Sequence, residues 1–168
     1  MNEQILQDVI EGQRGRFYGK YRGVVTQVDA QTMRIKANVP AVLGSTESGW
    51  ALPCVPYAGD SVGFAFLPET GSAVWIEFEG GNVSFPVWTG GFWLSSQVPS
   101  AAAADVKVIV TKQVKMMFND GQDSVTIQDS NGNSVTMDSS GITLTRGSQT
   151  VQVTDGEVNV NNGALEVT

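Results

Sequence analysis

A pair of glutamates in the middle of the chain has the residue types needed for acid–base chemistry. Glu77 and Glu79 lie two residues apart, so on an extended strand their side chains would share one face. A glycosidase uses two carboxyl groups held across a cleft. Neighbouring carboxylates on a solvated strand face are the commoner arrangement, and we therefore predict a surface role for this pair.

Other catalytic and metal-binding patterns are weaker still. The chain contains no histidine to activate a nucleophile, and it lacks the strained Gly-x-Ser-x-Gly elbow. The single cysteine, Cys54, excludes an internal disulfide and fits a small buried hydrophobe. The loop at 129–133 faintly resembles a calcium loop but lacks the downstream acidic ligand. We predict no enzymatic activity, no metal and no other cofactor.

The composition favours β structure with many turns. The 168 residues include 19 glycines, 41% are hydrophobic and only 16% are charged, which suits one or two small domains. No run approaches the roughly 18 apolar residues of a membrane span, and the start is not that of a signal peptide, so we expect synthesis in the cytoplasm. The net charge is −7, and residues 116–168 set seven acidic residues against Arg146 alone. This acidic C-terminal segment disfavours a nucleic-acid partner.

Residues 17–93 are predicted to form a small β-barrel. Five segments carry strand-like patterns: 21–28, 33–39, 61–67, 72–78 and 83–88. Turn residues at 29–31 and 79–82 separate two pairs of them. Five short strands suit a five-stranded OB-type barrel. Residues 94–105 have little apolar bulk and are predicted to be a linker.

From residue 106 onward, pairs of apolar residues recur with one polar residue between them. The starts of successive pairs are seven to ten residues apart, and glycine-containing turns fill the gaps. Each unit is therefore predicted to be a strand with two side chains on one face, followed by a turn. The expected core residues are Val125, Ile127, Val135, Met137, Ile142, Leu144, Val151, Val153, Val158, Val160, Leu165 and Val167.

One such unit cannot stabilise itself. Burial of two apolar side chains contributes roughly 3–6 kcal/mol, whereas ordering a whole unit costs roughly 10 kcal/mol or more in backbone entropy. Several chains that share one narrow core can offset this cost, and three chains around an axis form the simplest closed arrangement. We therefore predict a homotrimer in which residues 106–168 form an intertwined β-helix, a β-prism needle, so that the chain as a whole is all-β.

Residues 1–16 are predicted to be an N-terminal arm. Residues 3–11 carry apolar side chains at helical spacing, and a short helix is marginal alone, so it should dock on a partner; a frayed terminus is the open alternative. Basic residues follow it, which would suit an acidic ring. The expected docking residues are Ile5, Leu6, Val9, Arg14, Arg16, Lys20 and Arg22.

Four segments of the barrel carry a family resemblance: Arg22–Val25, Ala51–Pro56, Pro68–Gly81 and Pro86–Gly91. They resemble the OB-fold domain of phage baseplate spikes and of VgrG spikes in contractile injection systems. In that family an intertwined three-stranded β-helix follows the barrel. The resemblance implies a spike at the tip of a tail-like apparatus that attaches to a trimeric baseplate hub and pierces the target cell envelope. It also implies assembly into a virion or tail-like particle.

The resemblance covers residues 16–168, with two departures. The linker leaves no room for the lysozyme domain of some relatives, and without histidine there can be no histidine-bound iron tip. In VgrG-like spikes a small conical protein covers the end of the needle. We therefore predict that Leu165, Val167 and Thr168 dock a separate tip protein.

Two other functions stay open. One is an OB-type module that binds single-stranded nucleic acid on stacked aromatic rings and is trimerised by its tail. Against it, Trp75 and Trp88 lie in apolar strand patterns, where burial in the barrel or in a trimer interface is expected. The other is a tail fibre that binds receptors or glycans, although no aromatic residue follows Phe118.

Overall fold

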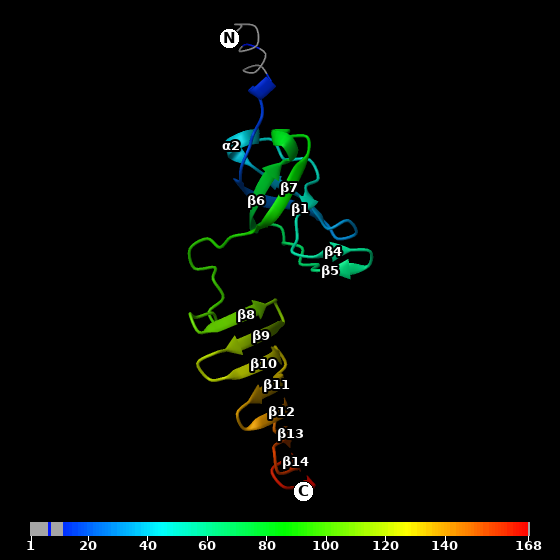
Figure 1. The fold of residues 1–168 in the computed structure, drawn as a ribbon, viewed down its shortest axis with the longest axis vertical. Helices are drawn as coiled ribbons and strands as arrows, with labels where there is room; N and C mark the ends of the chain where they lie inside the picture. Colours follow the sequence, from blue (N-terminus) through cyan, green and yellow to red (C-terminus); the bar gives the residue numbers. More distant parts are fainter. Residues whose placement is uncertain (1–6, 8–11, 168) are drawn as a thin grey trace. The chain divides into compact units, whose positions relative to one another are not determined.

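The structure is a computed structural model that describes residue 7 and residues 12–167. The chain divides into two compact units, Met1–Ser96 and Gln97–Thr168 (Figure 1). Strands make up nearly all of the regular structure in the described ranges, so the predicted all-β class is confirmed. The predicted arm helix at 3–11 falls almost wholly outside these ranges.

The first unit contains a five-stranded sheet that closes on itself. Its strands, in spatial order, are β2 (Arg34–Asn38), β1 (Tyr21–Asp29), β6 (Ala73–Phe78), β7 (Pro86–Gly91) and β3 (Leu52–Pro53). Only the β3–β7 pair is parallel. Ile35 and Ala51 exchange backbone hydrogen bonds with N–O distances of 2.7 and 3.4 Å, which joins β2 to the start of β3. The closed sheet fits the predicted OB-type barrel.

Apolar side chains from alternate strand positions fill the barrel. The buried cluster comprises Val25, Ile35, Ala37, Val39, Ala51, Val74, Ile76, Phe78 and Trp88. The indole Nε1 of Trp88 donates a hydrogen bond to the carbonyl oxygen of Met33 at 3.2 Å, so its one polar atom is satisfied. The predicted burial of Trp88 in the barrel is confirmed. Trp75 instead lies on the outer face and is only partly buried.

The fifth strand of the barrel is not the predicted one. Residues 61–67 do not form a barrel strand; a separate hairpin of β4 (Ala58–Gly59) and β5 (Val62–Gly63) lies there. Ser61 has a φ of 60° and Gly63 a φ of 153°, which interrupts the extended backbone that the alternation suggested. The true fifth strand, β3, has two residues, too few to show a period of two.

Short turns connect β1 to β2 and β6 to β7, whereas the other connections of the barrel are longer. The predicted turn after β1 is present, and Asp29 stabilises it by accepting hydrogen bonds from the Gln31 backbone N–H and the Thr32 hydroxyl at 3.0 and 2.6 Å. The helix α2 (Pro40–Leu43), which the sequence patterns did not predict, follows β2 and begins with proline, as first helical turns tolerate. The 3₁₀ turn η1 (Glu79–Gly81) follows β6.

The second unit is one antiparallel sheet in which each strand pairs with the next along the chain. Figure 1 shows its strands as successive rungs. They are β8 (Val106–Val110), β9 (Val114–Asn119), β10 (Ser124–Asp129), β11 (Asn133–Asp138), β12 (Gly141–Arg146), β13 (Gln149–Val153), β14 (Val158–Val160) and β15 (Leu165–Val167). The predicted alternation of strand and turn is present. A single chain forms an open sheet rather than the predicted β-helix, because an intertwined helix needs strands from other chains.

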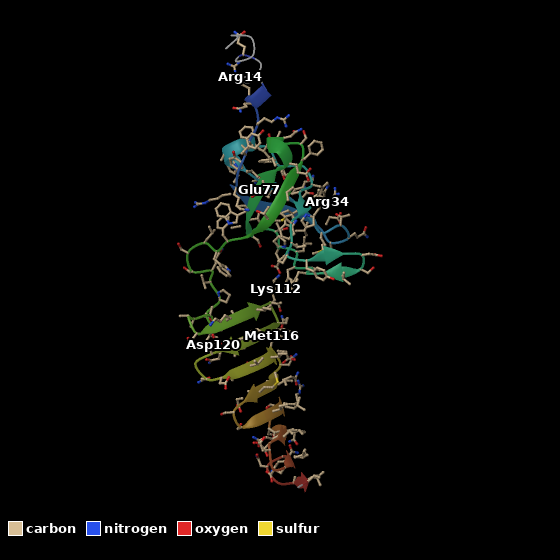
Figure 2. All side chains as sticks on the ribbon, viewed as in Figure 1. Arg14, Arg34, Glu77, Lys112, Met116 and Asp120 are labelled. Carbon is tan, nitrogen blue, oxygen red and sulfur yellow. The ribbon has the colours of Figure 1, made fainter. Side chains whose placement is uncertain are left out.

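The second unit has no interior of its own. None of its described residues is buried. Figure 2 shows side chains standing on a single layer of strands, with no second layer from the same unit. A β-sheet that is open on both faces lacks the packing that normally stabilises it.

Asp129 stabilises the turn between β10 and β11 through its side-chain carboxylate. Its Oδ1 accepts hydrogen bonds from the backbone N–H groups of Asn131 and Asn133 at 2.8 and 2.9 Å, and its Oδ2 accepts one from the Asn133 side chain at 2.6 Å. These bonds stabilise the charged carboxylate, chiefly those from Asn133, and lower the pKa of Asp129 from 3.8 to about 2. Hydrogen bonds from Ser140 lower the pKa of Asp138 at the next turn.

We predict that acid weakens these turns. Between pH 3.8 and about 2, the Asp129 carboxyl binds a proton more readily in the unfolded chain than in the folded chain. The free energy of unfolding therefore falls as the pH drops through this window. Asp129→Asn should flatten that dependence, and Asp129→Asn/Asp138→Asn should flatten it further. Denaturant unfolding at several pH values measures the slope. A double variant whose stability falls with acid as steeply as the parent's would contradict the prediction.

Candidate functional site

The cross-strand register places all twelve predicted core residues on the same face of the second unit. They form two ladders, in which each residue directly opposes the next member on the neighbouring strand. The first ladder is Val125, Met137, Ile142, Val153, Val158 and Val167. The second ladder is Ile127, Val135, Leu144, Val151, Val160 and Leu165. The result is an apolar stripe two residues wide, called the apolar face below.

Much of the apolar face is open to solvent in one chain. Leu144, in the middle of the sheet, is 47% exposed, and Ile142 beside it is 44% exposed. The second ladder lines a groove of about 490 Å³ on this face. Exposed apolar patches of this extent mark surfaces that another molecule covers.

Both apolar ladders continue onto β9, and the second also continues onto β8, where the first meets Lys107. Phe118 opposes Val125, and Met116 opposes Ile127, so β9 adds two large side chains to the apolar face. Ile109 on β8 opposes Met116. Sequence reasoning missed these residues because Met117 separates Met116 from Phe118, and three consecutive apolar residues conceal the period of two. Pairing the segments 107–109 and 116–118 with the later repeats could have revealed them.

The opposite face of the sheet is mainly polar. Thr126, Thr136 and Thr143 lie at successive paired positions, and the hydroxyl oxygens of Thr126 and Thr136 are 3.4 Å apart. Gln152 and Asn159 continue this row. From β10 to β14 the two faces therefore differ sharply in polarity, as in a sheet with one solvated face. On β8 and β9 the opposite face also carries the apolar Val108 and Met117.

The two glutamates that suggested acid–base chemistry do not share a strand face. Glu77 lies on the outer face of β6 (labelled in Figure 2), where its Oε1 is 2.7 Å from the Nζ of Lys20. Glu79 begins η1, where the chain turns away from β6. The pair fits the predicted surface role. The described part of the chain contains no group of three or more acidic, cysteine or histidine side chains that is placed to hold a metal ion.

The predicted docking residues at the N-terminal end are only partly described. Ile5, Leu6 and Val9 lie outside the described residues. The Arg16 side chain donates a hydrogen bond to the carbonyl oxygen of Gly80 at 3.1 Å. Arg22 lies over the rings of Trp75 and Phe92, 5.9 and 5.8 Å from their centroids, and Lys20 is paired with Glu77 as above. Arg14 is exposed in the turn before the barrel.

The remaining predicted positions differ in their outcome. Cys54 is exposed, so its predicted burial is wrong. It follows β3, and its backbone N–H donates a hydrogen bond to the carbonyl oxygen of Trp88 on β7 at 2.9 Å. Leu165 and Val167 are exposed on β15, an outer strand of its sheet. Thr168 lies outside the described residues.

A closed five-stranded barrel followed by a repetitive sheet with one uncovered apolar face fits the class of proteins that assemble through such a face. Comparison with protein families agrees. Residues 21–93 match the type VI secretion system/phage-baseplate injector OB domain. Residues 106–166 match the phage baseplate V C-terminal trimerisation domain. The chain belongs to the baseplate spike family of phages and type VI secretion systems. A search of curated proteins found no match.

Membership of this family gives the chain a structural role in a baseplate-associated spike, within a virion or tail-like particle. The trimerisation domain supports a homotrimer. Among the described residues, the helices are too short or too polar to cross a membrane.

Proposed function

We propose that three copies of the chain wind their second units into a β-prism needle whose axis is lined by the apolar faces. The observation that carries this proposal is the pair of ladders, twelve apolar residues on one face without cover in a single chain. Three such faces turned toward one axis would remove them from water. Leu144, 47% exposed in one chain, would then gain about half of the roughly 1.5–3 kcal/mol that full burial of an exposed leucine contributes.

This arrangement would also make the needle stiff. Strand edges are the weak points of an open sheet, and a closed prism of three chains pairs or covers them. The polar row of Thr126, Thr136 and Thr143 would face water. A rigid shaft of this kind can transmit axial force without bending.

The spike would be attached through its N-terminal part and would pierce the target cell envelope when a sheath contracts. The injector OB domain supports this role, because its family description places it in an injection apparatus. We assign attachment to a trimeric hub to the arm and the adjoining basic residues, among them the exposed Arg14. No catalytic step is part of the proposed function.

A small tip protein would cover the β15 end of the needle. Leu165 and Val167 expose apolar side chains there, and β15 has a strand neighbour on one side only in the single chain. An apolar partner with a flat base that contacts all three copies fits this surface.

Nucleic acid is not the proposed partner. Two lysines of the barrel already contact carboxylates: Lys20 lies 2.7 Å from Glu77, and Lys36 lies 3.3 Å from Glu47. Phosphate binding would have to break these pairs, and the acidic second unit would repel a nucleic-acid backbone. Retention on single-stranded DNA that weakens with salt would favour the nucleic-acid alternative instead.

Immunogold electron microscopy of purified tail-like particles tests the proposed function. Antibody against the protein should label the central tip of the baseplate, one site per particle. After particles contract on target cells, the protein should co-fractionate with the cell envelope. Label at the baseplate periphery would favour a receptor-binding fibre, and label along the sheath would contradict both.

A further inference from the structure

The barrel carries an exposed aromatic surface that its own fold does not use. The segment after β3 holds the β4–β5 hairpin and the residues that follow it. Phe66 is 57% exposed, and its ring stacks on that of Phe64, with centroids 6.1 Å apart and an interplanar angle of 29°. Tyr57 and Val62 are also exposed in this segment. These residues form what we call the loop patch.

A groove lies beside the loop patch. Its volume is about 540 Å³, and its lining includes Cys54, Val55, Phe64, Phe66 and Trp88. The lining contains no charged side chain. A groove of this chemistry fits apolar or aromatic side chains of a partner and offers no charged group to bind a phosphate.

A second aromatic surface lies on the other side of β7. Trp75, on β6, packs against Phe92 with ring centroids 4.7 Å apart, and Arg22 of β1 lies over both rings. Trp93 follows Phe92 in the chain and is 65% exposed, and Leu94 is 52% exposed. In the strand order, β6 and β3 flank β7, so this tryptophan patch and the loop patch lie on opposite sides of one strand.

Two different patches are what a ring of three identical subunits requires. In a cyclic trimer each subunit contacts its neighbours through two distinct surfaces, because the contact is head-to-tail. The trimerisation domain begins at residue 106, a dozen residues after Trp93. It holds three barrels near one another, so that even a weak contact between them forms at a high effective concentration.

We propose that the loop patch of each barrel docks on the tryptophan patch of the next barrel in the trimer. The aromatic rings of Phe64 and Phe66 pack against those around Trp75, and Cys54 is covered in the groove. The barrels then form a closed ring that fixes them to one another independently of the second units. This inference rests on the trimer of the proposed function.

The thiol of Cys54 reports on this contact. In the full-length protein, its rate of reaction with an aromatic disulfide reagent should be at least tenfold below that of an introduced cysteine in the β1–β2 turn, Gln31→Cys in a Cys54→Ser background. Trp75→Ser should restore the Cys54 rate in the next subunit, although it changes nothing in the groove of its own chain. Arg22→Glu should do the same without creating a cavity, in case the tryptophan variant fails to fold.

The molar mass from light scattering is measured on each variant. A trimer in which Cys54 reacts as fast as the control cysteine overturns the barrel contact and leaves the needle intact. A slow Cys54 that neither patch variant accelerates shows that something other than the next barrel covers the groove, and it also overturns the proposal. A monomeric parent protein refutes the trimer itself.

Discussion

Leu144→Asp is expected to abolish the trimer. Leu144 lies in the middle of the second ladder, opposite Val135 on β11 and Val151 on β13. In the proposed needle, the substitution would bury three unpaired carboxylates around one axis. An unpaired buried charge costs about 3–5 kcal/mol, and the cost recurs in each copy. Light scattering should give the mass of one chain rather than of three.

Thr143→Asp is the matched control. It introduces the same charge one residue away, on the same strand and on the polar face, where Thr136 and Gln152 are its paired neighbours. The trimer should persist with its stability changed by less than about 1 kcal/mol per chain. If Thr143→Asp dissociated the trimer and Leu144→Asp did not, the needle would be built with its faces reversed.

Gly141→Ala is expected to have the second-largest effect. Gly141 begins β12 with a φ of 132°, a backbone conformation that side chains rarely tolerate. An added Cβ would lie 2.1 Å from the carbonyl oxygen of Val153 on β13. Either the turn or the β12–β13 pairing must shift, which should cost about 3 kcal/mol or more per chain. Thermal unfolding followed by circular dichroism should show a lower transition temperature.

Gly147→Ala separates steric overlap from backbone strain alone. Gly147 also has a positive φ, 58°, but no atom lies within 4 Å of an added Cβ. Its substitution should cost only about 1 kcal/mol per chain. Equal transition temperatures for the two variants would show that the close approach to Val153 is not maintained in the assembled needle.

The apolar face could be predicted from the sequence because a period of two fixes which side chains share one face of a strand. Once Ile142 and Leu144 lie on a strand, both side chains point to one face, and the short turns force neighbouring strands to pair in order. The energetic shortfall of one repeat then indicated that other chains must supply the cover. Met116 and Phe118 were not predicted because Met117, an apolar residue on the other face, interrupts the alternation.

The surface of the barrel could not be predicted in the same way. Lys20 and Arg22 were expected to contact a partner because sequence reveals charge but not the neighbours of that charge. The fold brings Glu77 to Lys20 and two aromatic rings to Arg22 across distances of more than fifty residues. Cys54 was expected inside for a related reason. Whether an apolar residue beside a two-residue strand points inward depends on a register that so short a strand does not display.

The unequal spacing of the repeats has a consequence for how three identical chains find each other. A ladder of equal rungs would let one chain slide by a whole rung and still bury its apolar residues. Here the pairs that start at residues 125, 135, 142, 151 and 158 are separated by 10, 7, 9 and 7 residues. A chain displaced by one rung would meet strands and turns of the wrong length along the sheet. The unequal turn lengths thus favour a single alignment of the three chains.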